Sequence, residues 1–195
     1  HVLVMDGYSL DNTVDVSLSH GASVIQLDKL WGIAGAVEAG ILEAFNGGYE
    51  YLVRIDADGQ HPTSEIKEIL GTVVSGRADF VIGSRFLGMS DYNPNGLRKM
   101  SISIINLLLK VLHRVEITDC TSGCHIYNKK VIEFFARDKN FEYSEIRAIW
   151  MAKKAGFKIK EEFINMAPRK SGASSFSVIV ALGFMFKNIL DLILS

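Results

Sequence analysis

Two carboxylates two residues apart, Asp56 and Asp58, lie at the end of the apolar stretch 51–55. A carboxylate is costly to bury at the mouth of a strand unless it is paired or binds a cation. Mg²⁺ and Mn²⁺ prefer oxygen ligands, and Mg²⁺ usually combines one or two carboxylates with waters and substrate phosphates. The spacing therefore predicts that Asp56 and Asp58 bind Mg²⁺ or Mn²⁺ against the phosphates of a nucleoside diphosphate.

Each residue of this run also has a second interpretation. Asp58 would cap the turn before Pro62. Asp56 would reach the metal through water, bind a ribose, or be a solvated carboxylate at a strand end. His61 is expected to fix the turn rather than to bind a metal.

Strand-like and helix-like segments alternate through the first half of the chain. The expected strands are 2–5, 23–27, 51–55 and 80–83, and the expected helices are 11–20, 32–45 and 63–75. This alternation predicts a mostly parallel sheet covered by helices, with ligands beyond the carboxyl ends of the strands. Asp6, the Asp56–Asp58 pair and Arg85 all follow predicted strands, so we expect them at one edge.

The second half is expected to contain helices at 97–111, 129–137 and 144–155, strands at 124–127 and 158–165, and a polar segment at 167–177. Residues 178–194 have apolar side chains at helical spacing, interrupted by Lys187, Asn188 and Asp191. This segment is too short and polar for a membrane span. We expect it to pack on its own domain, or to contact a membrane surface or a second copy.

The bulk composition excludes several classes. The 195 residues suit a single domain, and a net charge of -1 gives no basic field for nucleic acid. Cys120 and Cys124 are too few for a disulfide scaffold, and with His125 they do not complete a zinc site. Reduced thiols are therefore expected.

Six pieces of the chain carry a resemblance that covers nearly its whole length. They are Met5 to Thr13, Gly32 to Ala36, Asp56 to Pro62, Val81 to Phe86, Thr118 to Gly123 and Arg169 to Ser175. In this order and spacing they resemble the family 2 glycosyltransferases, most closely the dolichyl-phosphate mannose synthase and polyprenyl-phosphate sugar transferase branch. The chain departs from the family pattern at Met5, which replaces a carboxylate, and at His125, which replaces an arginine.

The resemblance implies an α/β GT-A fold, a mostly parallel central sheet flanked by helices. We expect one catalytic domain over residues 1–195 that lacks the family's first strand and helix, as in a fragment. The implied activity is inverting, Mg²⁺- or Mn²⁺-dependent transfer of a sugar from a nucleotide-sugar donor to a polyprenyl or dolichyl phosphate or a cell-surface glycan. The expected location is cytoplasmic, peripheral at the membrane face.

On the donor side, the resemblance implies that Gln60 is a third metal-associated residue and that Asp6 meets the nucleotide base or ribose. Gly32 would let the chain approach the donor closely, and Arg169 with Lys170 would clamp the diphosphate. Each of these residues has an alternative role. Gln60 would be a surface glutamine, Asp6 would cap a helix, and Gly32 would permit close helix packing. Arg169 and Lys170 would be a solvated charge pair.

On the acceptor side, Arg85 is expected to bind an acceptor phosphate bidentately. Arg98 and Ser101 would add phosphate contacts, and Ser122 with Gly123 would shape the pocket. An ion pair between Arg85 and a local acid is the alternative.

The predicted general base is Asp119, with Glu145, and less so Glu142, as the competing base. For an anionic phosphate acceptor, Asp119 would mainly orient the acceptor. Structural alternatives are a loop carboxylate that caps backbone N–H groups at Asp119 and a solvated carboxylate at the start of a helix at Glu145.

Two other function classes remain open from the sequence. A sugar-phosphate nucleotidyltransferase also combines an α/β sheet with metal-binding carboxylates. A non-catalytic module that binds nucleotide sugars would explain the lost carboxylate at Met5.

Overall fold

The computed structural model describes residues 1–28, 31–88, 96–138, 141–167 and 189–190. Arg169, Lys170 and all but two residues of the predicted helix 178–194 lie outside these ranges. Within the described part of the chain, no helix is long and apolar enough to cross a membrane.

The elements follow the predicted order closely. In chain order they are β1 (Leu3–Asp6), α1 (Thr13–Ser19), β2 (Ser23–Gln26), α2 (Gly32–Asn46), β3 (Tyr51–Arg54), α3 (Thr63–Val74), β4 (Phe80–Ser84), α4 (Gly96–His113), β5 (His125–Asn128), α5 (Lys129–Arg137), α6 (Glu145–Lys154) and β6 (Ile159–Phe163).

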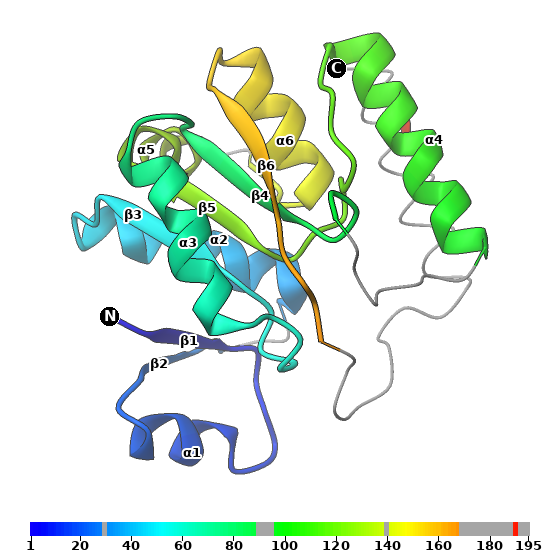
Figure 1. Ribbon diagram of the computed structural model, residues 1–195. Coiled ribbons are helices and arrows are strands. Elements are labelled where there is room, and N and C mark those ends of the chain that lie inside the picture. Colours follow the sequence, from blue (N-terminus) through cyan, green and yellow to red (C-terminus); the bar gives the residue numbers. More distant parts are fainter. Residues whose placement is uncertain (29–30, 89–95, 139–140, 168–188, 191–195) are drawn as a thin grey trace.

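The strands form two sheets (Figure 1). β1 and β2 pair in parallel as a separate ribbon. The larger sheet has the order β3-β5-β4-β6, in which β4 and β6 are parallel and β5 runs against β3 and β4. Three of its four strands therefore point the same way, and the mostly parallel α/β arrangement is confirmed. The reversal of β5 was not predicted.

Strand β4 is the centre of the core because all five of its residues are buried. Its side chains alternate between faces, as strand geometry requires. Phe80 and Ile82 belong to the larger apolar cluster, which includes side chains of α4, α5 and α6. Val81 faces the smaller cluster with Ile69 and Val73 of α3. The carboxyl end of β4, where Arg85 follows, is thus fixed by packing from both sides.

The local signals at helix ends have mixed outcomes. Gly47 ends α2, and Gly48 adopts φ +69, which favours glycine. The expected helix 11–20 begins at Thr13, and Asn12 occupies the cap position without a side-chain hydrogen bond. Asp11 still binds the first turn, since its Oδ1 accepts from Thr13 N at 3.0 Å.

Candidate active site

The loop after β3 presents the two predicted metal ligands. Asp58 Oδ1 accepts a hydrogen bond from Gln60 N at 3.1 Å, so the turn is fixed by its own carboxylate. Gln60 Nε2 donates to Ala167 O at 3.0 Å, and Ala167 N donates to Gln60 O at 2.9 Å. A carbonyl can only accept, so the amide nitrogen must face Ala167. The Oε1 of Gln60 therefore points away from Ala167, and its role as a neutral oxygen ligand stays a prediction.

Asp56 lies at an exposed edge and has a cationic neighbour. Its side chain is 44% exposed, and its Oδ1 accepts from Arg54 Nη2 at 2.8 Å. Nη1 of the same guanidinium lies 3.1 Å from Glu145 Oε1, as an ion pair without the alignment of a hydrogen bond. Burial alone would lower the pKa of Arg54, but Tyr143, Glu145 and Asp56 outweigh it, so its pKa is raised and it stays charged.

These residues fit a divalent cation that also binds substrate. Among the described residues, no three His, Cys, Asp or Glu side chains form a group that could hold a metal by themselves. Asp56 and Asp58 supply two carboxylates, and Gln60 supplies an amide oxygen. Mg²⁺ typically completes such a set with phosphate oxygens and waters, so a diphosphate would supply the remaining ligands.

Glu145 does not have the solvated position that we considered for it. Its side chain is 19% exposed and paired with Arg54. Burial raises its pKa, and the charge of Arg54 opposes that rise. Ser144 caps α6 by accepting from Arg147 N, which places Glu145 in the first helical turn.

Arg85 and Asp119 form a buried ion pair. The guanidinium is 4% exposed and donates through Nε to Asp119 Oδ2 and through Nη2 to Oδ1, both at 2.6 Å. The Arg85 backbone N–H also donates to Asp119 at 3.1 Å. The local ion pair, which was the alternative for Arg85, is therefore what the structure contains.

This pairing favours the structural alternative for Asp119. Its side chain has no exposed surface, and both of its oxygens accept from Arg85. To accept a proton from an acceptor, Asp119 would have to leave a buried, bidentate partner, which is strongly unfavourable. The carboxylate stabilises Arg85, and its role as the general base stays a prediction.

Glu161 of β6 holds the loop that carries Asp119. Its carboxylate accepts from the backbone N–H groups of Thr118 and Asp119, at 2.7 and 2.8 Å, and from the Thr118 hydroxyl at 3.0 Å. Burial raises the pKa of Glu161, and these hydrogen bonds oppose it. No local pattern predicts this role, because Glu161 lies 42 residues from Asp119.

Ser122 and Gly123 are both buried, and their role in shaping the acceptor pocket stays a prediction. Ser122 is fully buried, and its Oγ donates to Gly83 O at 2.5 Å. A Cβ at Gly123 would collide with the Asp56 carboxylate. Gly123 is therefore needed for close approach to Asp56, and Ser122 braces that approach against β4.

Four other predicted site residues, Asp6, Gly32, Arg98 and Ser101, lie on β1, α2 and α4. Asp6 is buried at the end of β1, where hydrogen bonds from Ser9 lower its pKa. Asp6 therefore binds the turn that follows β1, and its contact with the nucleotide base or ribose stays a prediction. Gly32 adopts φ +66 at the start of α2, while Arg98 is exposed and Ser101 half-buried on α4.

A chain of buried polar side chains next to Asp56 was not predicted from the sequence. The Arg54 guanidinium lies 5.6 Å from the ring centroid of Tyr143. His125 Nδ1 faces the hydroxyl of Tyr143 at 3.2 Å and that of Tyr127 at 2.8 Å. A charged residue within the apolar stretch 51–55 was the available signal, since Arg54 must find a partner there.

Cys120, Cys124 and His61 are also buried. Cys120 and Cys124 are free and buried, as expected for reduced cysteines, and burial raises the pKa of Cys124 to about 11. His61 is 7% exposed, and burial lowers its pKa. Neither ring nitrogen has a hydrogen-bond partner among the described residues.

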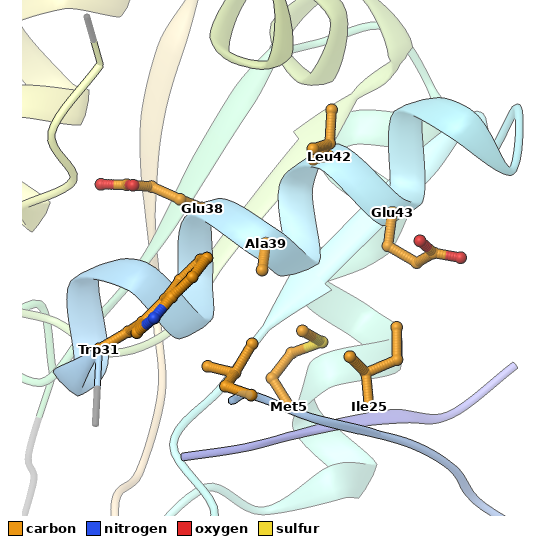
Figure 2. Close-up of a pocket in the computed structure, with 8 residues that line it drawn as sticks. Met5, Ile25, Trp31, Glu38, Ala39, Leu42 and Glu43 are labelled. Atoms are coloured by element: carbon orange, nitrogen blue, oxygen red, sulfur yellow. The ribbon is translucent and has the colours of Figure 1, made fainter. Parts of the chain in front are cut away.

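Two cavities lie on other parts of the surface. One of about 380 Å³ separates α2 from the β1–β2 ribbon, with Met5 and Ile25 facing Trp31 and Ala39 (Figure 2). The other, about 440 Å³, is lined by α4, the loop at 116–118 and Glu161. Neither of these two cavities is lined by Asp56 or Asp58.

Comparison with known proteins identifies the family. Residues 1–135 match the family described as "Glycosyl transferase family 2". The chain is 30% identical to a polyprenol monophosphomannose synthase of Mycolicibacterium smegmatis, over 96% of this chain and 74% of that protein. It is 29% identical to an undecaprenyl-phosphate mannosyltransferase of Micrococcus luteus, over 90% of this chain and 75% of the relative.

Solved structures support the same fold. A glucosyl-3-phosphoglycerate synthase from Mycobacterium tuberculosis superimposes with a TM-score of 0.66 at 16% identity, over 98% of this chain and 67% of that one. That enzyme has also been crystallised with Mn²⁺ and UDP-glucose, in a structure with a TM-score of 0.63, 16% identity, and coverage of 98% and 66%. The predicted GT-A fold is confirmed. On its sequence match, the chain belongs to glycosyl transferase family 2 and is a glycosyltransferase.

Proposed function

We propose that the chain transfers a sugar, with inversion, from a nucleotide-sugar donor to a polyprenyl phosphate. The loop after β3 carries the proposal: the Asp56 and Asp58 carboxylates and the amide oxygen of Gln60 suit Mg²⁺ or Mn²⁺ on the donor diphosphate. Two relatives that match most of the chain are named for polyprenol or undecaprenyl phosphate.

The acceptor chemistry agrees with the pairing of Asp119 and Glu145 with arginines. A phosphate oxygen is already anionic at neutral pH and attacks the anomeric carbon directly. The bond from that carbon to the donor diphosphate breaks, and its electron pair leaves with the diphosphate. The bound metal would offset the charge of this leaving group. Neither Asp119 nor Glu145 needs to accept a proton.

Helix α4 favours a lipid acceptor over a soluble glycan. Its exposed apolar side chains recur at helical spacing and include Met100, Ile104, Leu107 and Val111. Exposed Arg98 and Lys99 begin the same helix. An apolar stripe with basic residues at one end suits an anionic membrane surface. We therefore place the protein at a membrane face.

Transfer to lipid phosphate tests the proposal. Purified protein with Mn²⁺, a panel of radiolabelled nucleotide sugars and undecaprenyl phosphate should yield a labelled glycolipid. Asp58→Asn should reduce the rate by at least about 100-fold if the carboxylate binds the metal. Exposed Glu116→Gln is the matched control and should keep the wild-type rate.

Three other results would point away from the proposal. Label transferred only to glycan would make the acceptor a polysaccharide. Release of pyrophosphate from a nucleoside triphosphate and a sugar phosphate would indicate the nucleotidyltransferase. Donor binding without transfer or hydrolysis, for every donor tested, would indicate the non-catalytic module.

A further inference from the structure

Arg54 connects the Asp56–Asp58 loop to helix α6. It donates to Asp56 Oδ1 at 2.8 Å and lies 3.1 Å from Glu145 Oε1, with 9% of its side chain exposed. One guanidinium thus serves two carboxylates, one of which would bind the metal. The side chains of Arg54 and Glu145 are 9% and 19% exposed, so the attraction between their charges is only weakly screened by solvent.

The charges around the metal loop can be counted from these contacts. Within the contact itself, Asp56 and Glu145 carry two negative charges, and Arg54 carries one positive charge. A net charge of minus one therefore remains to attract a cation. Without the carboxylate of Glu145, Arg54 would neutralise Asp56, and the contact would offer the cation no net charge.

The surrounding contacts keep Glu145 and Arg54 in this arrangement. The Tyr143 ring lies beneath the Arg54 guanidinium, with 5.6 Å from its centroid to Cζ. Tyr143 N donates to Glu38 of α2 at 2.6 Å, which fixes the segment before α6. The cap at Ser144 then sets the direction of the first turn. The Tyr143 ring, the hydrogen bond to Glu38 and the Ser144 cap therefore together keep Glu145 facing Arg54.

We propose that Glu145 is a positioning residue which, by sharing the charge of Arg54, leaves Asp56 able to bind a divalent cation. The inference rests on the proposed function, because it takes the Asp56–Asp58 loop as the metal site. Glu145 acts through Arg54 and touches neither substrate nor metal. It follows that the residue serves metal binding before any sugar is transferred.

Mn²⁺ binding without donor tests this role apart from turnover. Free Mn²⁺ is measured by electron paramagnetic resonance during titration of wild type, Glu145→Gln and the control Glu116→Gln, an exposed residue with the same charge change. Glu145→Gln should raise the Kd for Mn²⁺ by about 10- to 100-fold, the range for groups that orient a metal ligand. The control should bind as wild type does.

A double variant separates charge sharing from simple structural damage. Arg54→Met with Glu145→Gln removes one charge of each sign and keeps an apolar stem over Tyr143. The Kd should return to within about threefold of wild type, whereas two structural defects would add. Glu145→Asp, which withdraws the carboxylate from Arg54, should give an intermediate Kd and covers the case in which Glu145→Gln folds poorly.

The outcomes are distinct. Equal Mn²⁺ affinity of wild type and Glu145→Gln overturns the role of Glu145 alone. A double variant that binds no better than Glu145→Gln also overturns it. Wild type that does not bind Mn²⁺ overturns the proposed metal site, and the inference with it.

Discussion

Asp56 and Asp119 are carboxylates of the same type in opposite surroundings. Asp56 is 44% exposed and shares Arg54 with Glu145, so it keeps capacity for a further cation. Asp119 is fully buried and gives both oxygens to Arg85. Asp56, on the loop after β3, could therefore bind a metal in addition to Arg54. Asp119 could not, and it stabilises the end of β4 through Arg85.

Replacing Asp119 by Asn tests its structural role. The change leaves the Arg85 charge buried and unpaired, so the free energy of unfolding should fall by about 3–5 kcal/mol. Urea denaturation measures the loss, and exposed Glu116→Gln should change stability by less than about 0.5 kcal/mol.

The rate per folded molecule separates this role from that of a base. We expect it to fall less than about tenfold, because a phosphate acceptor needs no proton removed. A variant with near wild-type stability but a loss of 10²–10⁴ in rate would restore Asp119 as the base.

Residues close in sequence were predictable and distant pairs were not. Asp56 and Asp58 were identified because a strand and its following turn are local. The Arg85–Asp119 pair spans 34 residues and Arg54–Glu145 spans more, so their contacts depend on how strands and helices pack. Gly123 shows the same limit, because its closeness to Asp56 appears only once β5 lies beside β3.

At the scale of elements, the expected segments agree with the observed helices and strands to within a few residues. Apolar periodicity and glycine or proline signals are sufficient for this. Strand direction is different, since β5 lies antiparallel between β3 and β4 by register rather than by any local pattern. The separate β1–β2 ribbon was likewise not apparent from the alternation of strands and helices.

Strand β5 makes stability depend on pH through His125. Burial first, and the charge of Arg54 second, lower its pKa well below the usual value near 6.5. The folded protein therefore stays neutral at His125 while the unfolded chain binds a proton. Its contribution is present above about pH 6.5 and is lost as pH falls, by about 1.4 kcal/mol per pH unit.

Urea denaturation at pH 7.5, 6.5 and 5.5 measures this slope. The raised pKa values of Glu145 and Glu161 act in the opposite direction, because these groups take up protons in the folded state first. The difference between wild type and His125→Gln isolates the histidine. The variant should be less stable at pH 7.5 and lose less stability on acidification. Parallel slopes would show that His125 titrates alike in both states.

At the scale of the molecule, the metal loop, the Arg85–Asp119 pair and α4 follow strands of one sheet or connect them. Figure 1 shows α4 as an outer helix, away from the β1–β2 ribbon. The β1–β2 ribbon and the helix that carries the exposed apolar stripe thus lie apart in the molecule.

The apolar stripe of α4 should bind membranes if the acceptor is a lipid. Leu107 and Val111 are 60% and 67% exposed, and their insertion would remove apolar surface from water. Leu107→Glu with Val111→Glu should weaken binding to vesicles containing anionic lipid by at least about tenfold in a flotation assay. Ser103→Glu with Lys110→Gln, also on α4, lowers the charge by the same two units without touching the stripe or the basic residues that begin the helix. If both pairs weaken binding equally, charge and not apolar insertion holds α4 to the vesicle, and the stripe serves another surface.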